Sequence, residues 1–173
     1  MSWVFMMKHK SEAFNNFKQW KTLVENQTGK KIKQLRTDNG LEFYSSEFDE
    51  FYHSEGIARH RTVRDTPQQN GVAEHLNQTL LERARCMLSN AGLARRFWAE
   101  AVNTACYLIN RGPHTGIHLK TPYEMWFGKP ADYSNLKVFG CPVYYYINEG
   151  KLEPRARKGV FLGYGGGVKG YRI

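Results

Sequence analysis

The chain has 173 residues, of which 41% are hydrophobic, so a single folded domain, or one domain with part of another, is expected and extensive disorder is excluded. The formal net charge of +9 indicates a polyanionic partner, although a basic chain can also simply gain solubility. Three isolated cysteines exclude a disulfide framework, and no apolar run is long enough to span a membrane.

The first 62 residues predict alternating strands and helices. An apolar run predicts a strand at 3–8, and recurring apolar residues predict a helix that begins near Ser11 and ends at Gly29. A second strand follows at 32–36. A capping box of Ser46 and Asp49 predicts a short helix that ends at Gly56, before a third strand at 57–62. This alternation is typical of an α/β layer.

Two long helices are expected next, at 72–91 and 95–111. The first has an apolar stripe, and the predicted core-facing residues of the two helices are Ala73, Leu76, Leu80, Ala84, Met87 and Ala91, then Phe97, Trp98, Ala101, Ala105 and Leu108. After a stop at Gly112, residues 113–136 predict a linker with a short helix begun by Thr121 and Pro122. From 137 onward, short strands separated by glycine-rich turns predict an incomplete small barrel. The expected domains are therefore 1–112, 113–136 and 137–173.

Asp38 and Glu74 are candidate metal ligands. Asp38 follows the second predicted strand, and Glu74 lies at the start of the long helix, with 35 residues between them. Two such carboxylates can converge on a divalent cation. Taken alone, however, such a pair is more often a turn residue and an acid favoured by the helix dipole.

Longer motifs in the sequence are more specific than this spacing. The segments LRTDNGLEF, TPQQNGVAEHLNQTLLERARCML, FWAEAVNTACYLINR, TPYEMWFGKP, LKVFGC and KGVFLGY, in this order, resemble the integrase region of copia-type LTR retrotransposon polyproteins. The resemblance implies an RNase H-like catalytic core followed by the start of an SH3-like β-barrel. It also implies DNA integration by metal-dependent polynucleotidyl transfer with Mg²⁺ or Mn²⁺.

The resemblance also assigns residues. Asp38 matches the second acid of a catalytic triad and Glu74 matches the third. The loop with Gln68, Gln69 and Asn70 matches the mobile active-site loop that contacts a DNA end in related integrases. Where the family usually has arginine, this chain has His75 and Gln78, and the loss of two positive charges should weaken phosphate contacts.

The first acid of the triad has no counterpart, because no Asp or Glu precedes Glu12. The family places that acid upstream of the strand at 3–8, in a sheet with strand order 3-2-1-4-5. The chain then supplies only strands 3, 4 and 5, so we expect an N-terminally truncated core that is inactive by itself. An unpaired sheet edge should favour self-association or pairing with another chain, and a marginally stable monomer. The alternative is a non-catalytic remnant that at most binds nucleic acid or a protein.

Basic residues near the C-terminus are the better candidates for DNA contact. Lys151, Arg155, Arg157 and Lys158 form a dense cluster flanked by the aromatic residues Tyr144–Tyr146 and Phe161. An ordinary charged turn is an equally good explanation. For Arg83, Arg85, Arg95 and Arg96 a solvated helix face is the favoured interpretation. We also expect Trp98 and Trp126 in the core, buried thiols, and a nuclear or cytoplasmic location.

Overall fold

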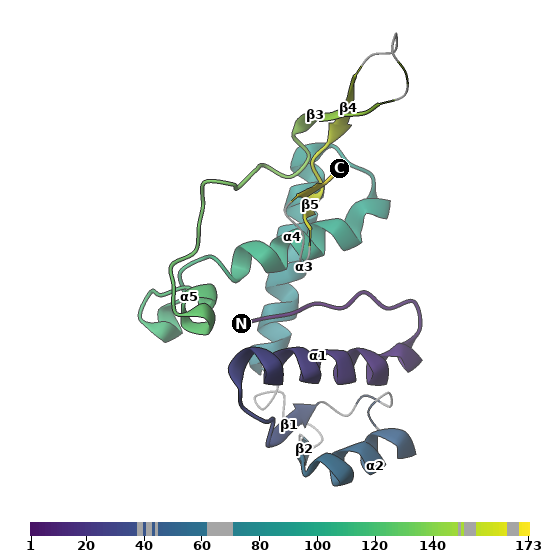
Figure 1. Ribbon diagram of the computed structural model, residues 1–173, viewed down its shortest axis with the longest axis vertical. Helices are drawn as coiled ribbons and strands as arrows, with labels where there is room; N and C mark the ends of the chain where they lie inside the picture. Colours follow the sequence, from purple (N-terminus) through teal and green to yellow (C-terminus); the bar gives the residue numbers. More distant parts are fainter. Residues whose placement is uncertain are drawn as a thin grey trace. The chain divides into compact units, whose positions relative to one another are not determined.

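The computed structural model describes residues 1–37, 40, 43, 45–61, 71–148, 150, 155–165 and 170–173, with the side chain of Arg61 left aside. The chain forms two compact units. One comprises Phe5–His75, and the other comprises Met1–Val4 with Leu76–Ile173. Figure 1 shows the main helices and strands, coloured in chain order. The boundaries predicted at 112 and 136 both lie within the second of these units, and they stay predictions.

The unit Phe5–His75 is a small α/β layer. A short 3-10 helix, η1 (Lys10–Glu12), leads into α1 (Ala13–Thr28), followed by β1 (Gln34–Thr37), α2 (Ser46–Glu55) and β2 (Ala58–Arg61). The two strands pair in parallel, from Gln34 opposite Ala58 to Thr37 opposite Arg61. Parallel pairing requires a crossover, which α2 provides. From α1 onward the predicted α/β alternation is therefore confirmed, with strand bounds shifted by one or two residues.

Aromatic side chains form the core of this unit. Phe48 is completely buried, and Tyr52 and Ile57 are buried beside it. Phe14 and Phe17 of α1 contact the Phe48 ring with centroids 4.8 and 5.9 Å away. Burying large aromatic rings is the main apolar contribution available to so small a unit. The core thus fastens both helices to the two-stranded sheet.

Glycine ends both helices of this unit as predicted. Gly29 and Gly56 have φ of 65° and 66°, a left-handed conformation that glycine adopts without a Cβ penalty. The predicted capping box at Ser46 is wrong by one residue. The N-cap is Ser45, whose hydroxyl accepts a hydrogen bond from the Phe48 N–H.

The predicted strand at 3–8 is not formed. Residues 1–7 have no regular secondary structure, because no strand in the described part of the chain lies beside them to share a ladder of hydrogen bonds. At Ser2 the side-chain amide of Asn110 makes the two hydrogen bonds that a neighbouring strand would make. Its oxygen accepts from the Ser2 N–H at 2.8 Å, and its nitrogen donates to the Ser2 carbonyl at 2.7 Å. Cys106 also donates to that carbonyl, at 3.4 Å. Burial raises the pKa of the Cys106 thiol, which keeps this donor protonated.

The second unit is built on α3 (Gly71–Ala91, which begins in the first unit) and α4 (Trp98–Ile109), with a 3-10 turn, η4 (Arg95–Phe97), before α4. Leu80, Ala105 and Cys106 form the buried cluster between the helices. The predicted pair of packed helices is confirmed.

Some burial predictions for these helices are wrong. Ala73 is exposed, and Trp98, the first residue of α4, is 53% exposed. Of the three thiols that we expected to be buried, Cys106 is buried, Cys141 is half-buried, and Cys86 is exposed on α3.

The C-terminal strands dock on α4. After η5 (Thr115–Ile117) and α5 (Pro122–Phe127), β3 (Pro142–Tyr146) pairs with β4 (Ala156–Val160), and β5 (Gly163–Tyr164) pairs with β6 (Tyr171–Arg172), both antiparallel. The Thr104 hydroxyl donates to the Leu162 carbonyl at 2.9 Å, and a Cβ on Gly163 would lie only 2.6 Å from that hydroxyl oxygen. The rings of Tyr107 and Tyr164 stack with centroids 3.8 Å apart. Strand β5 can therefore approach α4 this closely only because residue 163 is a glycine.

The predicted start of the short helix is confirmed. Thr121 caps α5, since its hydroxyl accepts from the Glu124 N–H at 3.0 Å, and Pro122 occupies the first helical position. None of the helices in the described ranges has the length and apolar character needed to cross a membrane.

Candidate functional site

The end of β1 leads directly to the first candidate ligand. Strands β1 and β2 run in parallel, so Thr37 and Arg61 lie at the same, carboxyl edge of the sheet. Asp38 follows Thr37 in the chain and lies outside the described residues. The Thr37 hydroxyl oxygen is buried and has no hydrogen-bond partner among the described residues. In parallel sheets this edge is where ligand-binding residues gather.

Glu74 lies where the sequence predicts it. It occupies the first turn of α3, and its side chain is exposed. Negative charge is stabilised at a helix N-terminus by the backbone dipoles, so an acid at this position is also expected where no ligand binds. The residues that precede the helix, including Gln68, Gln69 and Asn70, lie outside the described part of the chain.

His75 and Gln78 follow Glu74 along α3, and both are exposed. Gln78 lies one turn beyond Glu74, on the same side of the helix. Its amide nitrogen donates to the carboxylate of Glu82 at 3.2 Å. At this position the chain therefore presents a neutral amide that is already engaged with an acid.

The basic cluster near the C-terminus lies largely on a two-stranded ribbon. Arg157 and Lys158 belong to β4, Arg155 directly precedes it, and all three side chains are exposed. Lys151 lies outside the described residues. Phe161, which we expected to flank this surface, is completely buried below it. The four arginines of α3 and the following turn, namely Arg83, Arg85, Arg95 and Arg96, are exposed as expected.

Carboxylates are the metal ligands that this chain offers. Within the described ranges, no three His, Cys, Asp or Glu side chains lie together as a metal site. The Nδ1 atom of His114 accepts from the Gly116 N–H at 3.1 Å, which gives it a local role. Mg²⁺ prefers hard oxygen ligands and is often held by one or two carboxylates together with substrate phosphates. The exposed carboxylate of Glu74 and that of Asp38 are of the type that Mg²⁺ requires.

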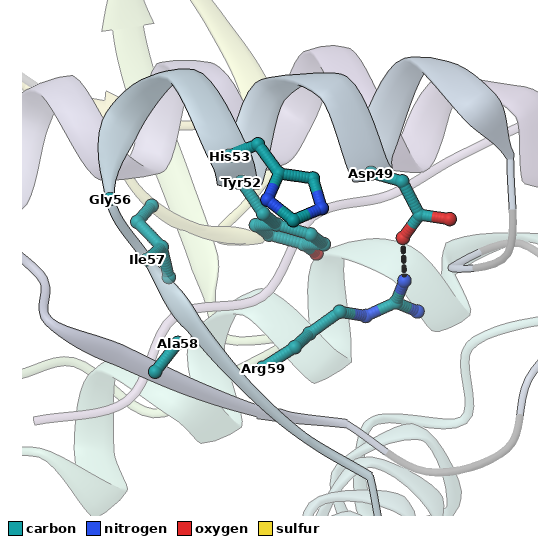
Figure 2. A pocket seen from close by; sticks show the side chains of 7 residues that line it. All are labelled: Asp49, Tyr52, His53, Gly56, Ile57, Ala58 and Arg59. Atoms are coloured by element: carbon teal, nitrogen blue, oxygen red, sulfur yellow. Dashed lines mark hydrogen bonds and ion pairs between the residues drawn. The ribbon is translucent and has the colours of Figure 1, made fainter.

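A cavity of about 560 Å³ between α2 and β2 was not predicted from the sequence. Figure 2 shows Arg59 reaching across it to the carboxylate of Asp49, and the guanidinium also donates to the Phe43 carbonyl. The guanidinium carbon lies 5.1 Å from the Tyr52 ring centroid. Burial raises the pKa of Tyr52 to about 12, so its hydroxyl stays neutral. These contacts hold β2 against α2. In the sequence, the spacing of the apolar residues of α2 was the only indication of them.

Comparison with known proteins was made at the level of both sequence and fold. Residues 141–173 match the family model of the retroviral polymerase SH3-like domain. The retrovirus-related Pol polyprotein from transposon TNT 1-94 of Nicotiana tabacum is 45% identical over 174 residues, which cover 99% of this chain and 13% of that polyprotein. A second such polyprotein, from transposon RE2 of Arabidopsis thaliana, is 34% identical over 94% of this chain and 11% of its own length. The chain thus spans about an eighth of these relatives.

Solved structures show the same fold. The HTLV-2 integrase catalytic core domain in complex with magnesium matches with a TM-score of 0.51 and 23% identity, over 69% of this chain and 71% of that one. A chain of the simian T-cell lymphotropic virus intasome matches with a TM-score of 0.55 and 21% identity, over 90% of this chain and 54% of that one. The predicted fold class, an integrase core followed by SH3-like sequence, is confirmed. The chain therefore belongs to the family of retrovirus-related Pol polyproteins of copia-type transposons.

Proposed function

We propose that this chain is a segment of an integrase that binds DNA, and that Asp38 and Glu74 are two of the acids that hold divalent cations for polynucleotidyl transfer in the integrase. The observation that carries the proposal is the pairing of β1 with β2 in an integrase-like fold. It sets the residue before Asp38 at the carboxyl edge of the sheet, while Glu74 starts the helix that follows β2. These are the strand end and helix start at which the family resemblance puts two of its three acids.

The chain's own residues would contribute charge and position. Mg²⁺ or Mn²⁺, when bound, would stabilise the attacking and leaving oxygens of a phosphodiester. Glu74 is held by the rigid first turn of α3 and points a carboxylate into solvent, where cations and DNA can reach it. Gln68, Gln69 and Asn70 would contact the DNA end. In end processing the nucleophile is water, and in strand transfer it is the 3′-hydroxyl of the processed end.

The 173 residues do not complete the triad. Within these 173 residues no Asp or Glu occurs before Glu12, which is the last residue of η1 and does not lie in a strand. We infer that Asp38 and Glu74 alone bind a divalent cation more weakly than a complete triad would, and that these 173 residues by themselves do not join DNA. The second candidate function is a non-catalytic remnant that retains nucleic-acid binding.

Positive charge on the ribbon of β3 and β4 would support DNA binding. The net charge of +9 favours a polyanion in general, and Arg155, Arg157 and Lys158 are exposed on one ribbon. His75 and Gln78 are expected to contact DNA more weakly than the arginines that the family usually has there. Among the described residues β1 pairs only with β2, so its other edge could accept a strand from a second chain.

Calorimetric titration with Mn²⁺ tests the metal site directly. The wild-type chain should bind the ion, and Asp38→Asn and Glu74→Gln should each abolish measurable binding. Glu47→Gln is the matched control, because Glu47 is also an exposed acid in the first turn of a helix but lies on α2. Unchanged binding by Glu74→Gln, or equal loss in the control, would contradict the assignment.

A strand-transfer assay separates the two functions. The chain alone should give no joined product. A chain extended upstream by a strand that carries an aspartate should join DNA when Mn²⁺ is present, and Glu74→Gln should remove that activity. An extended chain that binds Mn²⁺ and DNA but joins nothing would support the non-catalytic remnant instead.

A further inference from the structure

The ribbon of β3 and β4 has two different faces. In the antiparallel register Tyr144 lies opposite Lys158, and Tyr146 lies opposite Ala156. Directly opposed residues and residues two apart along a strand share a face. Tyr144, Tyr146 and Lys158 therefore share one face, whereas Tyr145 and its partner Arg157 lie on the other.

The Tyr145 face is covered by the end of the chain. A Cβ on Gly159, which lies on this face, would be 2.4 Å from Cγ2 of Ile173 and 3.3 Å from Cε1 of Tyr145. Ile173 is therefore seated against Gly159, and Tyr145 is only 36% exposed. Ile173 and Tyr145 therefore lie together on this face of the ribbon.

The opposite face is open and carries two aromatic rings. Tyr144 is 72% exposed and Tyr146 is 68% exposed, and Lys158 is exposed beside them. Neither tyrosine hydroxyl has a hydrogen-bond partner among the described residues. A lysine directly opposite Tyr144 would be costly to bury, so this face suits a solvent-facing, negatively charged ligand rather than a hydrophobic core.

We propose that Tyr144 and Tyr146 form a stacking platform for the unpaired bases of single-stranded DNA, with Lys158 contacting an adjacent phosphate. The inference deepens the proposed function, since it rests on DNA binding by this ribbon. Residues two apart on a strand are about 6.8 Å apart, which is about twice the 3.4 Å spacing of stacked nucleotides. The two rings can therefore engage bases of one strand without changing the backbone of β3.

Duplex DNA would bind to this surface differently from single-stranded DNA. In a duplex the base faces are stacked on one another, and only phosphates and base edges are accessible. Lys158 can bind a duplex phosphate, whereas the rings gain their stacking energy only from an unpaired base. The platform therefore predicts a preference for frayed or single-stranded ends that depends on the tyrosines and not on the lysine.

Fluorescence anisotropy can measure this preference with the full chain, using a labelled 20-nucleotide thymidine strand and a labelled duplex of equal length. Tyr144→Ala and Tyr146→Ala should each weaken binding to the single strand about fivefold or more and leave duplex binding within twofold. Tyr144→Phe and Tyr146→Phe keep the rings and should bind like the wild type. Lys158→Ala should weaken the binding of both ligands. It should also reduce the slope of log K against log salt by about 0.7 for the single strand and about 0.9 for the duplex, the effect of losing one phosphate contact.

Four outcomes would be informative. Selective loss for the single strand in both alanine variants, with retention in the phenylalanine variants, supports the platform. Equal loss for single strand and duplex, or no loss at all, overturns it while DNA binding stands. No binding of either ligand by the wild-type chain would overturn the proposed DNA binding as well. Circular dichroism of each variant checks the fold, which these exposed positions should leave intact.

Discussion

Replacing Asn110 with alanine tests whether one buried side chain fixes the beginning of the chain. Asn110 is 4% exposed, and its amide both accepts from the Ser2 N–H and donates to the Ser2 carbonyl, at 2.8 and 2.7 Å. A net intramolecular hydrogen bond contributes about 0.5–1.5 kcal/mol, so the loss of both should cost about 1–3 kcal/mol. Because Ser2 is only half-buried, water can partly replace the amide, which makes the upper value a limit.

Urea denaturation and hydrogen exchange measure the two parts of this effect. The unfolding free energy of Asn110→Ala should fall by the stated amount, and the N-terminal peptide should exchange faster than in the wild type. Asn103→Ala is the matched control, because Asn103 is a half-buried asparagine of α4, the helix that Asn110 caps, and the Ser2 backbone bonds to Asn110 instead. A change of less than about 0.5 kcal/mol in Asn110→Ala, or equal exchange in the two variants, would refute the reasoning.

Three further predictions concern the DNA surface, the ion pair of α1 and the sheet edge. Gln78→Arg adds a cation one turn after Glu74, so affinity for duplex DNA should rise and the logarithmic salt slope should steepen by about 0.9, measured by anisotropy; an unchanged slope would contradict contact there. The buried Lys21 ammonium bonds to Glu25 at 2.8 Å, and the resulting hydrogen bond lowers the pKa of Glu25 and raises that of Lys21. The contribution of ionised Glu25 to the free energy of unfolding is complete above its ordinary pKa of 4.5 and is lost as the pH falls through its lowered pKa. In urea denaturation, the difference in stability between wild type and Lys21→Met should therefore shrink in acid and stay constant from pH 5 to 9. The open edge of β1 predicts self-association in light scattering, and a monodisperse monomer with a cooperative thermal transition would argue against it.

The parts of the fold that the sequence predicts are those fixed by nearby residues. The 3–4 residue spacing of Phe14 and Phe17 and the stop at Gly29 are enough to place α1. The choice between Ser45 and Ser46 as the cap of α2 could not be made in this way, because both residues are serine, a residue type preferred at an N-cap.

Longer-range features were harder to predict. The apolar run at 3–8 is as good a strand candidate as the one that contains β1, yet a strand exists only if another strand lies beside it. At Ser2 the neighbour is instead a side chain more than 100 residues away, at Asn110. Trp98 shows the same limit, since helical spacing indicates a face but not whether a partner covers it. Hydrophobicity therefore predicts which segments can be buried and leaves the identity of the partner open.

The candidate DNA surface shows why residue type and spacing alone do not define a site. In the sequence, Tyr144, Tyr145 and Tyr146 and the basic residues near 155–158 form one aromatic and basic cluster. The register of β3 and β4 divides it, because Lys158 lies opposite Tyr144 and Arg157 lies opposite Tyr145. A shift of one residue in either strand would exchange the two cations between the faces. Which charge accompanies the exposed rings is thus decided by strand pairing and by the position of Ile173, and neither can be read from the local sequence of the cluster.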